Sequence, residues 1–177
     1  MTEDALRYPI GKFAPQEEYT TEDLQRIISR LEALPAKVEE TARKLTISQL
    51  DTAYRDGGWT VRQVLHHVAD SHLNAYIRFK WTLTEDTPTI KAYDEKAWAQ
   101  TPEIHLDPAI SVQLLKALHV KWVALIKSLS PQDLQRQFIH PETKRNNRLV
   151  NVLAMYAWHG EHHLAHITSL QKRMGWT

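Results

Sequence analysis

The sequence contains no cysteine and only five glycines. Without cysteine the chain can form no disulfide, bind no metal through a thiolate and use no cysteine nucleophile. Any thiol chemistry would therefore depend on a thiol that a substrate brings. Scarce glycine favours helices, because a glycine inside a helix costs about 1 kcal/mol relative to alanine. We expect a helical protein whose chemistry comes from other side chains.

An excess of charge of either sign is also missing. The 22 lysines and arginines balance 21 acidic residues, and no dense basic run is present, so we expect no nucleic-acid partner. No uninterrupted apolar run reaches the roughly 18 residues that span a membrane, and Met1 is not followed by a basic and then apolar leader. We therefore expect no membrane partner and a cytoplasmic location.

Helical periodicity dominates the chain. A length of 177 residues is typical of one domain, here residues 1–177, which can fold without a disulfide or a metal. Apolar stripes with a 3.6-residue period predict long helices at residues 20–45, 61–82, 108–128 and 148–173. Residues 1–20 are predicted to form an irregular arm. Residues 84–106 are predicted to form a long connection between the second and third helices, with a short helical turn near residues 94–99. The expected fold class is all-α, a four-helix bundle.

Local signals support the ends of these helices. Thr60 and Gln63 have the spacing of a capping box, and Asp107-Pro108 is a good helix start. Pro35 falls within the first helix, but the apolar stripe continues in phase beyond it, so we predict one kinked helix. The long connection leaves room for a crossover, so a simple up-down-up-down order is not required.

Histidines are the most informative feature of the last helix. His159, His162, His163 and His166 fall within eight residues and form two pairs spaced by four. Such a spacing puts two imidazoles on one helix face, where they can converge on one ion. A helical wheel turns His159 and His163 toward the apolar face. Because buried unpaired imidazoles are costly, a divalent cation is a natural partner for this pair.

The third ligand is ambiguous from the residues alone. A catalytic ion usually has three protein ligands and one open position, so a further ligand is expected from another helix. The second helix offers His66, His67 and His72. On the wheel His72 lies on its apolar face, whereas His67 lies to one side, so periodicity favours His72.

Longer motifs carry a family resemblance. They are YRDGGWTVRQVLHHVADSH at 54–72, WHGEHHLAHI at 158–167, RMGW at 173–176, YPIG at 8–11 and YDEKAW at 93–98. With these motifs the chain resembles the YfiT-type members of the DinB-like superfamily over essentially its whole length. The resemblance implies a four-helix bundle and a zinc or nickel site formed by His67, His159 and His163.

The resemblance therefore agrees with the pair on the last helix and replaces His72 by His67. His72 would then be a core or supporting residue, while His66 and His162 would be surface residues. The resemblance also suggests a homodimer. Exposed Trp and Leu side chains on the third helix could supply its interface, although core burial explains them equally well. The same wheel buries the following side chains of that helix: Ile110, Leu114, Leu115, Leu118, Trp122, Leu125 and Ile126.

Two reactions fit such a site. A divalent ion on three neutral imidazoles can activate water, as in a metal-dependent hydrolase, or a thiol, as in a thiol S-transferase. The family resembles both metal-dependent hydrolases and bacillithiol S-transferases. The expected partners are a small-molecule electrophile and, for the transferase, a low-molecular-weight thiol. The alternatives are a non-catalytic, metal-stabilised binding module, and a metal-free histidine patch that responds to pH.

Supporting roles are predicted for three further residues. Asp70, three residues after His67, could orient that ring through a hydrogen bond. Tyr156, on the inner face before His159, could touch a substrate. His140, from a loop, could be a fourth ligand that closes a purely structural site.

Overall fold

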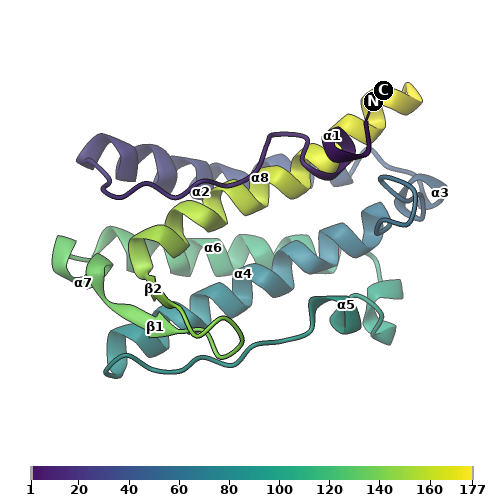
Figure 1. Cartoon of the computed structure of the whole chain (residues 1–177). Helices are drawn as coiled ribbons and strands as arrows, with labels where there is room; N and C mark the ends of the chain where they lie inside the picture. The colour runs from purple at the N-terminus through teal and green to yellow at the C-terminus, as the bar shows by residue number, and fades with distance from the viewer. Residues whose placement is uncertain (1, 177) are drawn as a thin grey trace.

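Four long helices form a bundle in the computed structural model, which describes residues 2–176 (Figure 1). This confirms the predicted four-helix bundle. The predicted helix boundaries agree with the observed ones to within about three residues. The helices are α2 (Thr21–Ala42), α4 (Val61–Thr84), α6 (Ala109–Lys127) and α8 (Leu149–Met174).

The caps explain where these helices begin and end. The side chain of Thr60 accepts a hydrogen bond from the backbone of Gln63, whose side chain reaches back to Thr60, as a capping box requires. Thr20 and Asp23 form the same arrangement at the start of α2. Gly175 ends α8 with a φ of 65°, a left-handed conformation that favours glycine.

The helix order departs from an up-down-up-down bundle. α2 packs against α6 and α8, and α4 packs against the same two helices, so α2 and α4 lie diagonally. α2 runs parallel to α8, and α4 runs parallel to α6 (Figure 1). Two consecutive helices that run parallel need a connection that returns along the bundle. Residues 85–108, which join the end of α4 to the start of α6, therefore run back along the length of α4, about 36 Å.

Short elements lie in the connections between the long helices and in the N-terminal arm, which contains a helix and is not irregular throughout as predicted. The helices are α1 (Glu3–Arg7), α3 (Ile47–Leu50), α5 (Glu95–Trp98), the 3-10 turn η1 (Pro102–His105) and α7 (Pro131–Gln135). Strands β1 (Gln137–Ile139) and β2 (Asn146–Arg148) pair antiparallel, with Phe138 opposite Asn147. The sequence did not predict this hairpin, because three-residue strands are too short to show an alternating pattern.

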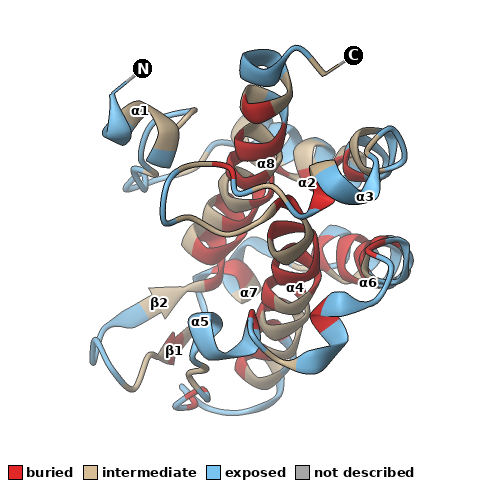
Figure 2. Cartoon of the chain, turned by 90° about the vertical axis from the view of Figure 1, so that its right-hand side faces the viewer, coloured by how far each residue is buried: buried red, intermediate tan, exposed pale blue. Residues whose placement is uncertain are grey.

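The core is split along the bundle axis into two apolar clusters. One contains Leu31, Phe79, Trp122 and Leu153, and the other contains Leu34, Leu65, Leu115 and Ile167. Three of the buried histidines are His72 on α4, His119 on α6 and His163 on α8. On each helix the histidine lies in sequence between residues of the two clusters. Figure 2 shows the buried residues of α4 and α8 on the faces that point into the bundle. The fold therefore carries a layer of imidazoles between two hydrophobic ends.

The outer face of α6 differs from the prediction. Ile110 and Leu114 are exposed, whereas Trp122 is fully buried and belongs to the core. By length and composition alone α6 could cross a membrane, but it packs against α2 and α4 as a core helix does. Trp and Leu side chains of this helix were considered for a dimer interface, and of these Leu114 is exposed whereas Trp122 is not. The homodimer stays a prediction.

Gly160 lets α8 approach α2 closely. A methyl group added there would lie 2.2 Å from Cδ2 and 3.1 Å from Cδ1 of Leu34, a side chain with 1% exposure. We expect Gly160→Ala to lower the free energy of unfolding by about 1–2 kcal/mol, because overpacking outweighs the gain in helix propensity. Urea denaturation measures this. In a Leu34→Ala background the same substitution should stabilise the protein, and destabilisation there would contradict the packing explanation.

Candidate metal centre

Three histidines from two helices converge between α4 and α8. One ring nitrogen each from His67, His159 and His163 lies within 4.8 Å of the other two. Nε2 of His67 lies 3.3 Å from Nε2 of His159. His67 and His163 are buried, whereas His159 is partly exposed. The structure thus brings together the three residues predicted as ligands.

The spacing of these nitrogens fits a metal ion. Two imidazole nitrogens bound to one tetrahedral zinc at 2.0–2.1 Å lie about 3.3–3.4 Å apart. The 3.3 Å between the two Nε2 atoms matches that value. Three nitrogen donors and no thiolate suit zinc or nickel better than calcium or magnesium.

Burial keeps these rings neutral. It lowers the pKa of His67 to about 4 and holds the pKa of His159 and His163 well below the ordinary value. Repulsion between the neighbouring rings acts in the same direction. Neutral imidazole is the form that binds a metal, so the site is prepared to do so at pH 7.

His72 lies behind the cluster and does not belong to it. Its Nε2 lies 3.4 Å from Nδ1 of His159, and its ring is fully buried next to Tyr156 and Trp122. The wheel favoured His72 because it points to the bundle axis. The cluster instead lies between α4 and α8, and His67 is on the side of α4 that faces α8.

Aromatic side chains line the cluster. The ring of Trp59 lies 4.6 Å from that of His67 and 6.4 Å from that of His163. Trp59 comes from the loop before α4, which is closed by hydrogen bonds between Tyr54 and Trp59 and between Thr52 and Val61. The structure thus places a side chain from this loop against two of the three rings.

The predicted supporting residues take different positions. Tyr156 is buried, with its ring 5.4 Å from that of His159. Asp70 is partly buried one turn beyond His67, and burial raises its pKa to about 6. His140 lies beside the hairpin, where its backbone pairs with Arg145. In the described part of the chain neither Asp70 nor His140 joins the cluster, and their roles stay predictions.

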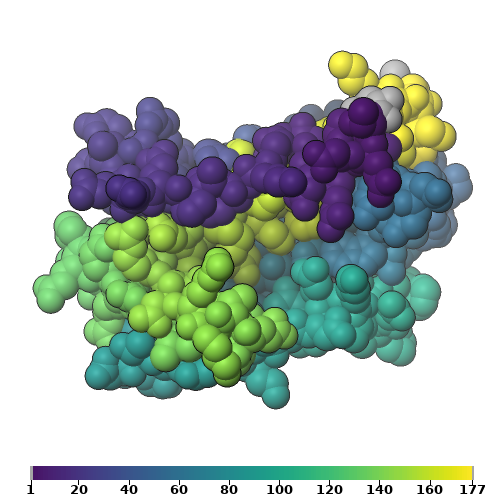
Figure 3. Space-filling model, in the orientation of Figure 1, coloured from purple at the N-terminus to yellow at the C-terminus, as the bar shows by residue number. Residues whose placement is uncertain are grey.

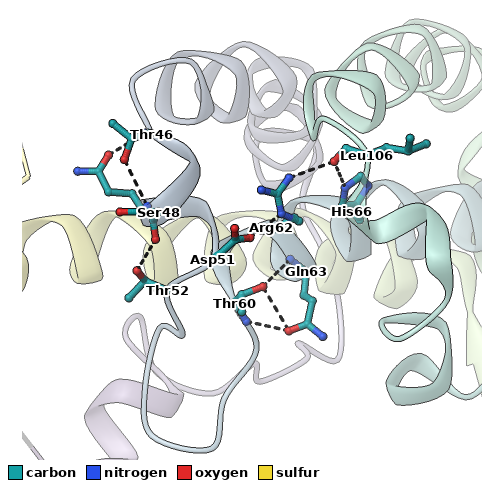
Figure 4. A network of polar contacts seen from close by, with 10 residues as sticks. Thr46, Ser48, Asp51, Thr52, Thr60, Arg62, Gln63, His66 and Leu106 are labelled. Atoms are coloured by element: carbon teal, nitrogen blue, oxygen red, sulfur yellow. Dashed lines mark hydrogen bonds and ion pairs between the residues drawn. The ribbon is translucent and has the colours of Figure 1, made fainter.

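The sequence did not predict the burial of three histidines. His66 was expected at the surface but is buried, with Nδ1 2.7 Å from Oγ of Ser111. Its Nε2 lies 3.4 Å from the carbonyl oxygen of Leu106 (Figure 4). His162 was also expected at the surface and is buried against Trp158. His166, to which the sequence assigned no position, is buried and pairs with the carbonyl of Arg7.

The N-terminal arm explains the burial of His162 and His166. It lies across α8, as the space-filling view shows (Figure 3), with the ring of Tyr8 5.9 Å from that of His162. A helical wheel treats the side away from the core as solvent. Here a segment from the far end of the chain covers that side.

Comparisons with known proteins agree with this arrangement. The model of the DinB superfamily matches residues 30–167. YfiT of Bacillus subtilis is 52% identical over the full length of both chains, and a Bacillus cereus protein is 50% identical over 97% of this chain and 98% of its own. Both names describe proposed metal-dependent hydrolases.

Solved structures support the fold in the same way. The structure of YfiT, described as a "probable metal-dependent hydrolase with an unusual four-helix bundle topology", superposes with a TM-score of 0.96 over 98% of this chain and 99% of its own. TT2238, a four-helix bundle protein, is 21% identical and gives a TM-score of 0.57 over 84% of this chain and 98% of its own. The second likeness concerns the fold alone.

Proposed function

The chain belongs to the DinB superfamily, and from this premise we propose that it is a metal-dependent hydrolase that uses one divalent ion held by His67, His159 and His163. The observation that carries the proposal is the convergence of three neutral ring nitrogens, two of them 3.3 Å apart, with no fourth protein ligand in the described cluster. We propose zinc as the ion, with nickel as the second choice.

The residues of the chain have separate tasks in this proposal. A divalent ion on three neutral ligands acts as a Lewis acid that lowers the pKa of bound water to about 7 and can equally bind a thiolate. His67, His159 and His163 supply nitrogen lone pairs without adding negative charge. Trp59 covers two of the rings, which limits access of water to them. Tyr156 packs beside His159, and we propose that it contacts the substrate there.

A thiol S-transferase is the second candidate function. One observation favours it: no carboxylate of the described residues joins the cluster as a general base. An incoming low-molecular-weight thiol such as bacillithiol ionises more readily than water and needs less help from a base. Its co-substrate would be a small electrophile.

One experiment separates the candidates. Protein stripped with a chelator is reloaded with one equivalent of zinc or nickel and incubated with an activated ester, an amide, or an alkylating electrophile, each with and without bacillithiol. Products are identified by mass spectrometry. A hydrolase releases acid without the thiol, whereas a transferase forms a thioether only when the thiol is present. Failure of the metal-loaded protein in every arm would overturn both and favour a non-catalytic binding module.

A further inference from the structure

A row of three imidazoles leads from the metal centre into the core. Nδ1 of His159 lies 3.4 Å from Nε2 of His72, and Nδ1 of His72 lies 2.9 Å from Nε2 of His119. Nδ1 of His119 lies 2.7 Å from the backbone carbonyl oxygen of Leu31. His72 and His119 have exposures of 0% and 2%, so neither ring relies on solvent for its partners.

Pro35 makes this carbonyl available. In an α-helix the carbonyl of residue 31 accepts a hydrogen bond from the N–H of residue 35. α2 continues through Pro35, which has no N–H, so the carbonyl of Leu31 lacks its partner within the helix. His119, which crosses from α6, takes that place. The proline inside α2 thereby provides a buried acceptor that a regular helix would lack.

An acceptor at one end fixes the polarity of the whole row. A carbonyl oxygen can only accept, so Nδ1 of His119 carries the proton. Burial lowers the pKa of His119 to about 4, so its ring is neutral and its Nε2 is a bare acceptor. His72 must then donate from Nδ1 and accept at Nε2. The opposite polarity would set the bare Nδ1 of His119 against the Leu31 carbonyl at 2.7 Å, lone pair to lone pair.

We propose that His72 and His119 are positioning residues that, anchored on the Leu31 carbonyl, hold the proton of His159 on Nδ1 and leave its Nε2 lone pair free at the metal centre. His159 donates from Nδ1 to His72, and its Nε2 is the atom that lies 3.3 Å from Nε2 of His67. A ligand histidine commonly donates its other N–H to a carboxylate or carbonyl. Here two further imidazoles relay that role to a backbone carbonyl in α2.

Removing His119 should reverse the tautomer preference of His159. In His119→Phe the Nδ1–H of His72 loses its acceptor, and a buried donor without a partner is costly. His72 then favours its other tautomer, which donates from Nε2 to His159 and moves the proton of His159 to Nε2. That proton occupies the lone pair that would bind a metal. The metal consequence rests on the proposed function, whereas the tautomer of His159 does not.

Nitrogen-15 NMR of the metal-free protein with labelled histidine tests the tautomer directly. Two-bond correlations should show His159 protonated at Nδ1 in the wild type and shifted toward Nε2 in His119→Phe. His119→Gln, whose amide can both donate to Leu31 and accept from His72, should restore the Nδ1 form. Zinc affinity, measured against a competing chelator, should fall about 10- to 100-fold in His119→Phe and recover in His119→Gln.

His66→Phe is the matched control. It removes another buried histidine, which pairs with Ser111 and lies outside the row, so it should leave the tautomer of His159 unchanged. A wild-type His159 protonated at Nε2 would overturn the proposal without any variant. Equal zinc affinities of His119→Phe and His66→Phe would also overturn it. Failure of the wild type to bind zinc, with His159 protonated at Nδ1, would contradict the proposed function and leave the row intact.

Discussion

Replacing His163 by alanine should abolish metal binding at stoichiometric concentrations. The variant leaves two ligands where the proposed site has three, and even supporting residues around a metal contribute 10- to 100-fold in affinity. We therefore expect the affinity for zinc to fall by more than about 100-fold. Activity in the product assay should fall to the level of the chelator-treated protein. Metal analysis after gel filtration, together with competition against a chelator, measures the loss.

His105→Ala is the control for this loss. His105 is exposed in η1 and lies outside the cluster, so its removal tests whether a histidine at any position would give the effect. The control should retain one metal ion per chain and wild-type turnover. A His163→Ala protein that kept one equivalent of metal would show that the ion binds elsewhere.

Acidification should destabilise the metal-free protein well above the pH at which carboxylates titrate. The pKa values of His67 and His119 are about 4 in the folded chain and about 6.5 when unfolded. As the pH falls, these rings are protonated in the unfolded state before they are protonated in the folded state. The stability that the neutral rings provide is therefore complete above about pH 6.5 and is lost as the pH falls toward 4. At pH 5 the loss is about 2 kcal/mol for each ring.

One group opposes this trend. Burial raises the pKa of Asp70 to about 6, so as the pH falls its carboxylate is protonated in the folded state before it is protonated in the unfolded state. This uptake stabilises the folded state and offsets about 1 kcal/mol of the loss at pH 5. The buried rings of His72, His159 and His163 act in the same direction as His67. We therefore expect the free energy of unfolding to fall by at least about 3 kcal/mol between pH 7 and pH 5.

Urea denaturation of chelator-treated protein at the two pH values measures this difference. His119→Phe removes one of the titrating rings, so its loss over the same interval should be smaller by about 2 kcal/mol. Equal stability at pH 7 and pH 5 would show that the histidine layer is hydrated or already protonated in the folded state.

The long helices could be predicted from the sequence because their signals are local. Periodic apolar residues and the capping box of Thr60 and Gln63 act within a few turns of chain, and the structure retains them. The order of the helices around the bundle could not be predicted. It depends on the path of residues 85–108, which carry no sustained pattern.

The metal centre was predictable only in part. The spacing of His159 and His163 places both rings on one face of a helix wherever that helix packs. The choice between His67 and His72 depends on which side of α4 faces α8, a tertiary property that a helical wheel does not contain. The family resemblance supplied that choice, and the same wheel gave no sign that His72 supports His159 from behind.

The exposed side of α8 shows a second limit. Periodicity turns His162 toward solvent, yet Tyr8 of the arm packs near it and Trp158 stacks on it. The arm has no periodic pattern that would predict its docking on a helix about 150 residues later. Contacts of this kind arise from tertiary structure and leave no trace in the local sequence.

The most direct measurement is anomalous diffraction from crystals of the protein loaded with zinc. It should reveal one ion at about 2.0–2.1 Å from Nε2 of His67, Nε2 of His159 and one ring nitrogen of His163. At least one further coordination position should be filled by a molecule other than the protein. An ion bound elsewhere, or one closed off by a fourth protein ligand such as His140, would contradict a catalytic three-histidine centre.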